Sequence, residues 1–333
     1  MSAAAGGTAT SVIAQVTRRW QVIDPLLPLA VTAPPGCDAS LVVAGPDGQP
    51  AATGSCEHWV GPPGSMDLAW GAARRFQLTP QVAGPDVTDA LDRLLSLWRD
   101  HLAEQPHSDD QDTAAVVTWP SRDIAGVAAL LRHGFAPLAV VAARPTGRPL
   151  TGSAGMAGTG ATAPGAAADD GVQIRRAGPA DIDTVVRLGL EVVRFDAHFS
   201  DTVERPDTAD ALRGEAAGLL YESEPWTWLA ERDGTAIGML AAERPESAGW
   251  IAPMTRLAPV AYLFLMVVLP GERGRGIGAD LVARLHRDVE AVGVPITLLH
   301  YEQVNPLSAP FWSQQGYRPL WTTWEARPAQ AVR

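Results

Sequence analysis

The chain has 333 residues, of which 46% are hydrophobic and 19% are charged. That length suits two domains of ordinary size, and that composition excludes a largely disordered chain. The formal net charge of −11 repels nucleic acid and anionic membranes, so we expect neither as a partner, whereas a cationic molecule would be attracted.

The cysteine content and the hydropathy of the sequence indicate the cellular compartment in which we expect the protein. Only Cys37 and Cys56 occur, and their spacing matches no metal or redox motif, which favours a reducing interior and no bound metal. Residues 1–10 lack a basic region followed by an apolar core, so we expect no signal peptide. The longest strongly apolar run, residues 257–270, is too short to span a bilayer. We therefore expect a cytoplasmic protein.

The sequence of the first part of the chain predicts several short strands. Strands at 41–44 and 51–54 flank an Asp47-Gly48 turn, and further strands are expected at 76–82 and 116–119.

A segment near the end of this part recurs later in the chain. Gly134-Phe-Ala-Pro-Leu resembles Gly316-Tyr-Arg-Pro-Leu, and the same shift places Asp123 on Asn305 and Trp119 on Tyr301. We interpret this as an internal duplication. A chance match of turn residues and periodicity is the alternative.

Residues 146–171 consist mostly of Gly, Pro, Ala, Thr and Ser, with too few large apolar residues to form a core. This composition predicts a flexible linker, which separates a domain at 1–145 from a domain at 172–333.

The second domain alternates strand and helix patterns. A helix is expected to start at Gly178-Pro-Ala-Asp181, and Asp233-Gly234 is a strong hairpin signal. Residues 276–292 carry apolar side chains on one helical face. The expected strands are 172–176, 226–231, 237–242, 262–269, 296–301 and 318–325, the last of which closes the sheet, and a short helix covers 309–315.

The stretch from Val267 to Gly278, VVLPGERGRGIG, carries the chemistry. A buried strand ends at Pro270, a glycine-rich loop follows, and a helix begins inside that loop. The start of a helix presents unpaired N–H groups and the positive end of the dipole, and glycines let the backbone approach a ligand. Arg273 and Arg275 add positive charge. The segment therefore predicts a site for a phosphate-bearing ligand.

This loop resembles the Arg/Gln-x-x-Gly-x-Gly/Ala motif of the GNAT acetyltransferase superfamily, here Arg273, Gly276 and Gly278. Four segments share the family's order and spacing: IRRAGPADIDTVVRL, LAERDGTAIG, VVLPGERGRGIG and NPLSAPFWSQQGY. The resemblance implies a mixed α/β fold, with a largely antiparallel central sheet flanked by helices, in tandem GNAT-like domains. It also implies a transfer of acetyl from acetyl-CoA, or of another acyl group, to the primary amine of a small-molecule or peptide acceptor.

The resemblance also implies roles for individual residues. Backbone N–H groups of Arg273, Gly274, Arg275, Gly276, Ile277 and Gly278 would bind the pyrophosphate of coenzyme A. The main chain of Met266, Val267 and Val268 would pair with the pantetheine arm, and an N–H near Val268 would stabilise the oxyanion. Asn305 would hydrogen-bond the pantetheine. A turn-forming role before Pro306 is the alternative.

The sequence departs from the family at Trp312, where a Tyr often protonates the departing thiolate. An indole N–H is no useful acid near neutral pH. Tyr301, Ser308, Tyr317 or solvent would replace it, or the thiolate would leave unprotonated, since a thiol pKa is near 8.5.

Several residues are candidates for the general base that deprotonates the amine. His300 and Glu302 alternate with Tyr301 on the strand beside the cofactor strand, so they share one face and would point into the acceptor cleft. Glu231 and Glu243, on the hairpin strands, are rivals. For each carboxylate, a solvated surface position is the alternative.

The first domain lacks the motif. After its strand 76–82 the chain reads Ala-Gly-Pro85-Asp86, in which Pro85 lacks an N–H group and Asp86 has the wrong charge for a pyrophosphate. We therefore expect a degenerate copy without a cofactor site, its opening strand and helix short or missing. Its expected role is structural: to cover an edge or face of the active domain, or to shape the acceptor cleft. Two other readings stay open: a non-catalytic acyl-CoA sensor, and an acyltransferase with an oxygen acceptor or a longer acyl chain.

Overall fold

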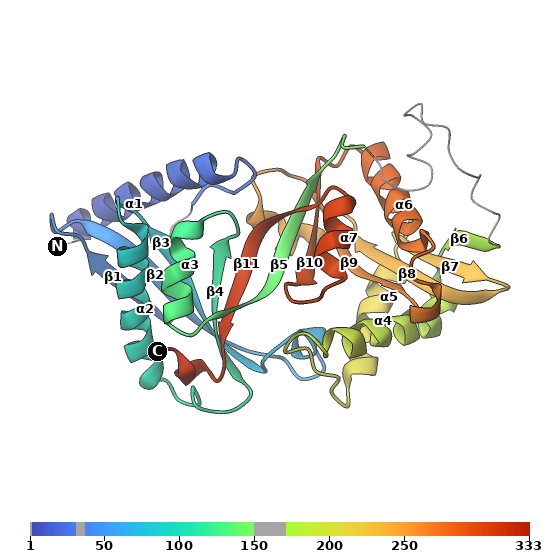
Figure 1. Cartoon of the computed structure of the whole chain (residues 1–333), viewed down its shortest axis with the longest axis horizontal. Helices are drawn as coiled ribbons and strands as arrows, with labels where there is room; N and C mark the ends of the chain where they lie inside the picture. The colour runs from blue at the N-terminus through green and yellow to red at the C-terminus, as the bar shows by residue number, and fades with distance from the viewer. Residues whose placement is uncertain (1, 31–36, 150–170) are drawn as a thin grey trace.

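The computed structural model describes residues 2–30, 37–149 and 171–333 (Figure 1). The strands of these residues form one continuous eleven-stranded sheet, in the order β1-β2-β3-β4-β11-β5-β10-β9-β8-β7-β6. Only the β3–β4 and β9–β10 pairings of this sheet are parallel, which confirms the expected mixed, largely antiparallel sheet. The strands are β1 Ala39–Ala44, β2 Pro50–Val60, β3 Arg74–Val82, β4 Thr113–Pro120, β5 Ala136–Pro145, β6 Val172–Arg176, β7 Thr227–Arg232, β8 Thr235–Glu243, β9 Val260–Val268, β10 Ile296–Glu302 and β11 Arg318–Ala326.

Helices cover both faces of the sheet. Successive side chains of β10, which point to opposite faces, contact different helices. On β10, Leu299 and Tyr301 pack with α6 and α7, whereas Leu298 packs on the opposite face with α1. Helices α4 and α5 share the face of α1, and none of the described helices is long and apolar enough to cross a bilayer. The helices are α1 Ser2–Ile23, α2 Val87–Ala103, α3 Ile124–Arg132, α4 Ile182–Asp196, α5 Thr208–Leu220, α6 Ile277–Ala291 and α7 Ser308–Gln314.

The two halves of the chain exchange strands at the centre of the sheet. We expected β11 to close the sheet of the second half, but it lies between β4 and β5, antiparallel to both. In turn β5, from the first half, lies against β10. The strand order from β1 to β4 and then β11 mirrors the order from β7 to β10 and then β5 (Figure 1). The boundaries at 145 and 172 remain predictions, and residues 150–170 of the expected linker lie outside the described residues.

The first half opens with a 22-residue helix, so the expectation of a short or missing opening helix was wrong. Its buried residues recur every four positions, at Val12, Val16 and Trp20, and Trp20 packs edge-on against Trp321 with ring centroids 5.2 Å apart. The prediction failed because residues 2–10 are Ser, Ala, Gly and Thr, with no apolar periodicity to indicate a helix.

The strand exchange predicts that both halves unfold together. Trp324 on β11 is buried in the core of the first half, so Trp324→Ala should lower the free energy of unfolding by about 3–5 kcal/mol. Urea unfolding followed by far-UV circular dichroism and by tryptophan fluorescence should show one coincident transition, shifted as a whole. Tyr221→Ala, at an exposed position, should change stability by less than about 0.5 kcal/mol. Two separate transitions, of which only one shifts, would contradict the coupling.

Candidate active site

The candidate site lies where β9 and β10 separate. Their parallel pairing runs from Val260–Ile296 to Leu263–Leu299 and then stops, while β9 continues along β8 to Val268. The N–H of Leu269 donates to the Ile237 carbonyl on β8, at 2.9 Å. Because successive N–H groups of a strand point to opposite sides, those of Met266 and Val268 face the gap.

The glycine-rich loop follows directly after β9. Gly274 and Gly276 have φ of 78° and 85°, a left-handed conformation that favours glycine. Helix α6 begins at Ile277, and its first turn closes when Asp280 N–H donates to the Gly276 carbonyl, at 3.0 Å. The N–H groups of residues 277–279 precede that bond, so they have no acceptor within the helix. They give the loop the geometry of an anion site.

The two arginines of the loop have partners of their own. Arg273 Nε donates to the Val268 carbonyl, at 3.0 Å, and its Cζ lies 4.5 Å from the centre of the Phe195 ring. Arg275 lies 3.8 Å from Glu272, which also pairs with Arg232. The Arg273 side chain therefore ties the loop to the end of β9, and the backbone remains the anion-binding part.

A cavity of about 1020 Å³ connects the loop, the gap and the centre of the sheet. Its lining includes residues of the second half and also residues of the first half and of β11 that the sequence did not indicate. Residues from the first half and β11 include Asp67, Trp70, Arg75, Ala139, Thr323 and Glu325. They reach the cavity because of the strand exchange, which leaves no mark in local sequence patterns.

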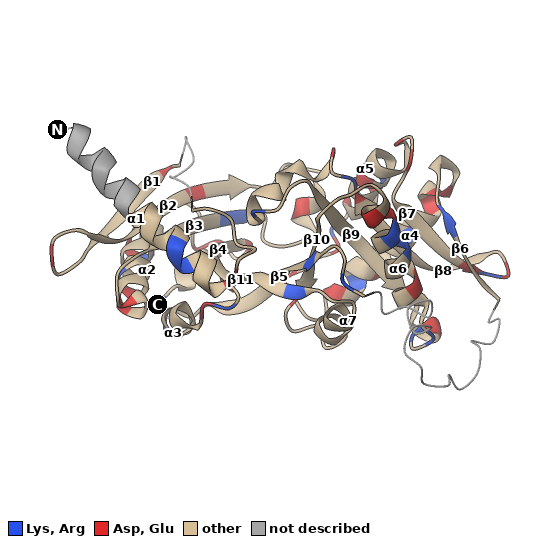
Figure 2. Cartoon of the chain, turned by 90° about the horizontal axis from the view of Figure 1, so that it is seen from above, with Lys and Arg blue, Asp and Glu red and all other residues tan. Residues whose placement is uncertain are grey.

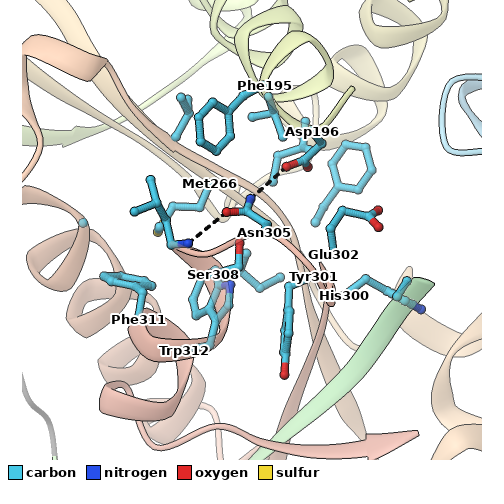
Figure 3. Close-up of a pocket in the computed structure, with 18 of the residues that line it drawn as sticks. Phe195, Asp196, Met266, His300, Tyr301, Glu302, Asn305, Ser308, Phe311 and Trp312 are labelled. Atoms are coloured by element: carbon cyan, nitrogen blue, oxygen red, sulfur yellow. Dashed lines mark hydrogen bonds between the residues drawn. The ribbon is translucent and has the colours of Figure 1, made fainter. Parts of the chain in front are cut away.

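His300, Tyr301 and Glu302 all line the cavity, and Tyr301 lies on the other face of β10 from His300 and Glu302 (Figure 3). His300 Nδ1 lies 3.0 Å from the Tyr262 hydroxyl, and its ring stacks on Trp250 with centroids 6.3 Å apart. His300 is exposed to solvent through the cavity, although the surrounding protein atoms desolvate the ring and lower the pKa of His300 to about 4. At neutral pH this imidazole is uncharged and has a hydrogen-bond partner.

Glu302 sits in the most perturbed environment of the three. Burial first, and then the carboxyls of Asp196, Asp201 and Glu325, raise the pKa of Glu302 to about 8. Its Oε2 is buried without a hydrogen-bond partner. Burial also raises the pKa of the neighbouring Asp196 to about 6, although a hydrogen bond from Asn305 opposes that shift. A carboxyl with such a pKa accepts or holds a proton near neutral pH.

Asn305 connects the end of α4 with the start of α7 (Figure 3). Its Nδ2 donates to Asp196 Oδ1, at 3.1 Å, and its Oδ1 accepts from the N–H of Leu307, at 3.0 Å. The turn-forming role is therefore present. The pantetheine bond stays a prediction, for which Nδ2 retains a second hydrogen.

The rival carboxylates lie outside the lining of this cavity. Glu231 pairs with Arg175, at 2.7 Å, and Glu243 accepts from the Trp250 indole, at 2.8 Å.

Of the predicted proton donors, Tyr301 and Ser308 line the cavity, as does Trp312. Tyr317 is not part of that lining, and its hydroxyl lies 3.0 Å from Nε2 of the buried His286. Burial raises the pKa of Tyr301, so its hydroxyl keeps its proton at neutral pH.

The corresponding region of the first half is closed to an anion. There β3 and β4 also pair in parallel, up to Leu78–Val117, and α2 also follows a left-handed glycine, Gly84. Its N-cap, however, is Asp86, whose carboxylate accepts from Asp89 N–H at 2.9 Å. The Asp86 carboxylate thus already places a negative charge at the start of α2, where an anionic ligand would otherwise bind.

Comparisons with known proteins find similarity to acetyltransferases. Residues 194–317 match the model of the acetyltransferase (GNAT) family. A mycothiol acetyltransferase from Frankia alni is 32% identical over 91 residues, which are 26% of this chain and 27% of that protein. The chain thus spans about a quarter of that relative's length. A GCN5-related N-acetyltransferase from Sphaerobacter thermophilus aligns with 87% of this chain and 80% of its own, at 16% identity and a TM-score of 0.52, which shows the fold alone.

Because Gly276, at the start of α6, has a left-handed conformation, we expect any side chain at this position to lower the free energy of unfolding. Gly276→Ala meets no steric clash, but the strained φ should lower the free energy of unfolding by about 1–2 kcal/mol. Gly218→Ala, within α5 and equally open, should instead be neutral or stabilise by up to about 1 kcal/mol. Urea denaturation measures both. Equal effects would mean that the conformation of Gly276 is not strained.

Proposed function

Because residues 194–317 of this chain belong to the GNAT acetyltransferase family, we propose that it transfers acetyl from acetyl-CoA to a primary amine. The acceptor, a small molecule or a peptide, attacks the thioester directly in a ternary complex. The observation that carries the proposal is the single cavity that runs from the open N–H groups of α6, through the gap between β9 and β10, to Glu302.

The residues at one end of the cavity suit the cofactor. Backbone N–H groups of residues 273–278 would hold its pyrophosphate, and the gap-facing main chain of Met266 and Val268 would pair with the pantetheine arm. Acetyl-CoA supplies a thioester that is activated toward amines. The Val268 N–H would stabilise the negative charge that develops on the thioester oxygen during attack.

Residues on the two faces of β10 would divide the proton transfers. Glu302 would take the proton from the ammonium of the acceptor, because its raised pKa suits a base near neutral pH. His300 would position the acceptor, since its low pKa and its contact with Tyr262 make it a poor base. Tyr301, on the side of α7, would protonate the thiolate in place of the tyrosine that Trp312 replaces, unless the thiolate leaves unprotonated.

A non-catalytic acyl-CoA sensor is the second candidate, and Trp312 is the observation that favours it. Detection of free thiol across a panel of amines and alcohols, with acyl donors of different length, separates this sensor from an N-acetyltransferase and from an acyltransferase with an oxygen acceptor.

Cofactor binding tests the loop. In calorimetry, wild-type protein should bind acetyl-CoA at micromolar concentration, and a Gly276→Asp, Arg273→Ala double variant should lose that binding. Aspartate would place a negative charge where the pyrophosphate belongs. Gly84→Asp is the control, because Gly84 is also a left-handed glycine and lies in the loop before α2, in the first half. Equal binding by both variants, or no binding by the wild type, would contradict the assignment.

The pH profile tests the base. The value of kcat/KM should rise as the pH passes about 8, where Glu302 loses its proton, and Glu302→Gln should remove this rise and lower the rate about 10²- to 10⁴-fold. His300→Asn should keep the rise, because His300 is already neutral above about pH 5. If Glu302→Gln keeps the rise and His300→Asn loses it, the roles are reversed.

A further inference from the structure

The cavity extends well beyond Glu302, onto strands that the exchange brings together. Ala139 on β5 pairs with Glu302 on one side and with Thr323 on the other, so the three residues share a face of the sheet. The lining continues along β11 to Glu325 and across the sheet to Arg75. Since β10 and β11 are two strand spacings apart, this extension lies about 10 Å from Glu302.

Two carboxyls at this distal end are almost fully buried. The side chains of Asp201 and Glu325 are 8% and 9% exposed, and both pair with the same cation, Arg327, which lies 2.6 Å from Asp201. Burial and the interaction with the Asp201 carboxyl raise the pKa of Glu325, although Arg327 opposes the shift. One guanidinium thus serves two carboxyls.

The other cation at this end, Arg75, interacts electrostatically with the carboxyls of Asp201 and Glu325 and is also held by main-chain carbonyls. Arg75 Nη2 donates to the Asp67 carbonyl, at 2.6 Å, and its Nε donates to the Ala72 carbonyl, at 3.2 Å. Its Cζ also lies 4.6 Å from the Trp59 ring. Together with Glu302, whose Oε2 has no hydrogen-bond partner, the extension has more carboxyl groups than guanidinium groups. Because its carboxyl groups outnumber its guanidinium groups, this end of the cavity disfavours an anionic substituent and favours a cationic one.

We propose that the acceptor carries two cationic groups about 10 Å apart, as in a long diamine or polyamine, and that Glu325 and Asp201 bind the group that does not react. This inference rests on the proposed function, in which the reacting amine lies at Glu302. The connecting chain would lie over Ala139 and beside Trp70, both of which line the cavity. Specificity for the acceptor would then depend on the first half and on β11.

Measurements of amine binding test the proposed second cation site without requiring that the protein catalyse a reaction. In calorimetry on the full chain saturated with coenzyme A, at pH 8, 1,8-diaminooctane should bind at least tenfold more tightly than octylamine. Glu325→Gln and Asp201→Asn should each remove this preference. Glu246→Gln, at an exposed position outside the cavity lining, is the matched control and should keep it. Thermal melting checks that each variant is folded.

Equal binding of the two amines, binding of neither, or an unchanged preference in both folded variants would overturn the inference. Thiol release from acetyl-CoA, measured with the same amines, reports on the proposed function separately. A diamine preference that depends on Glu325 but brings no thiol release would support the site and reject the transferase.

Discussion

His300, Tyr301 and Glu302 are held in the sheet by β5, a strand from the other half of the chain. The pairing of β10 with β9 ends at Leu299, whereas its pairing with β5 continues to Glu302–Ala139. Main-chain hydrogen bonds to β5 therefore keep the end of β10 in the sheet, although β10 separates from β9 along its other edge. The gap, the open N–H groups of β9 and the carboxyl that faces the cavity all follow from this one pairing.

The cavity is chemically polarised along its length. At one end, the start of α6 offers N–H groups and the positive end of a helix dipole. At the other end, buried carboxyls accumulate, and the ribbon in Figure 2 shows acidic residues spread widely over a chain with a net charge of −11. A polyanionic cofactor and a cationic acceptor would thus enter environments of opposite sign. Their reactive groups would meet between the two ends, near the gap.

Local patterns predicted the elements well and their neighbours poorly. The Asp233-Gly234 turn has positive φ at both residues, as its hairpin requires, and the left-handed Gly276 precedes α6 as the loop motif indicated. Nothing in the alternation of β11 indicated which strands would flank it, because period-two patterns specify faces but not partners. The sequence suggested that the first half could shape the cleft, but it did not indicate that Glu325 or the particular residues of the first half would line the cavity.

The exchange of β5 and β11 also sets an order of events during protein synthesis. Strands β4 and β5 leave the ribosome long before β11, which must later insert between them. Until then each presents an unpaired edge, the feature that most readily recruits a foreign strand. A second nascent chain carries the same β11, and its insertion would use the same contacts. The native architecture thus contains, within one chain, the geometry by which two chains would form a swapped dimer.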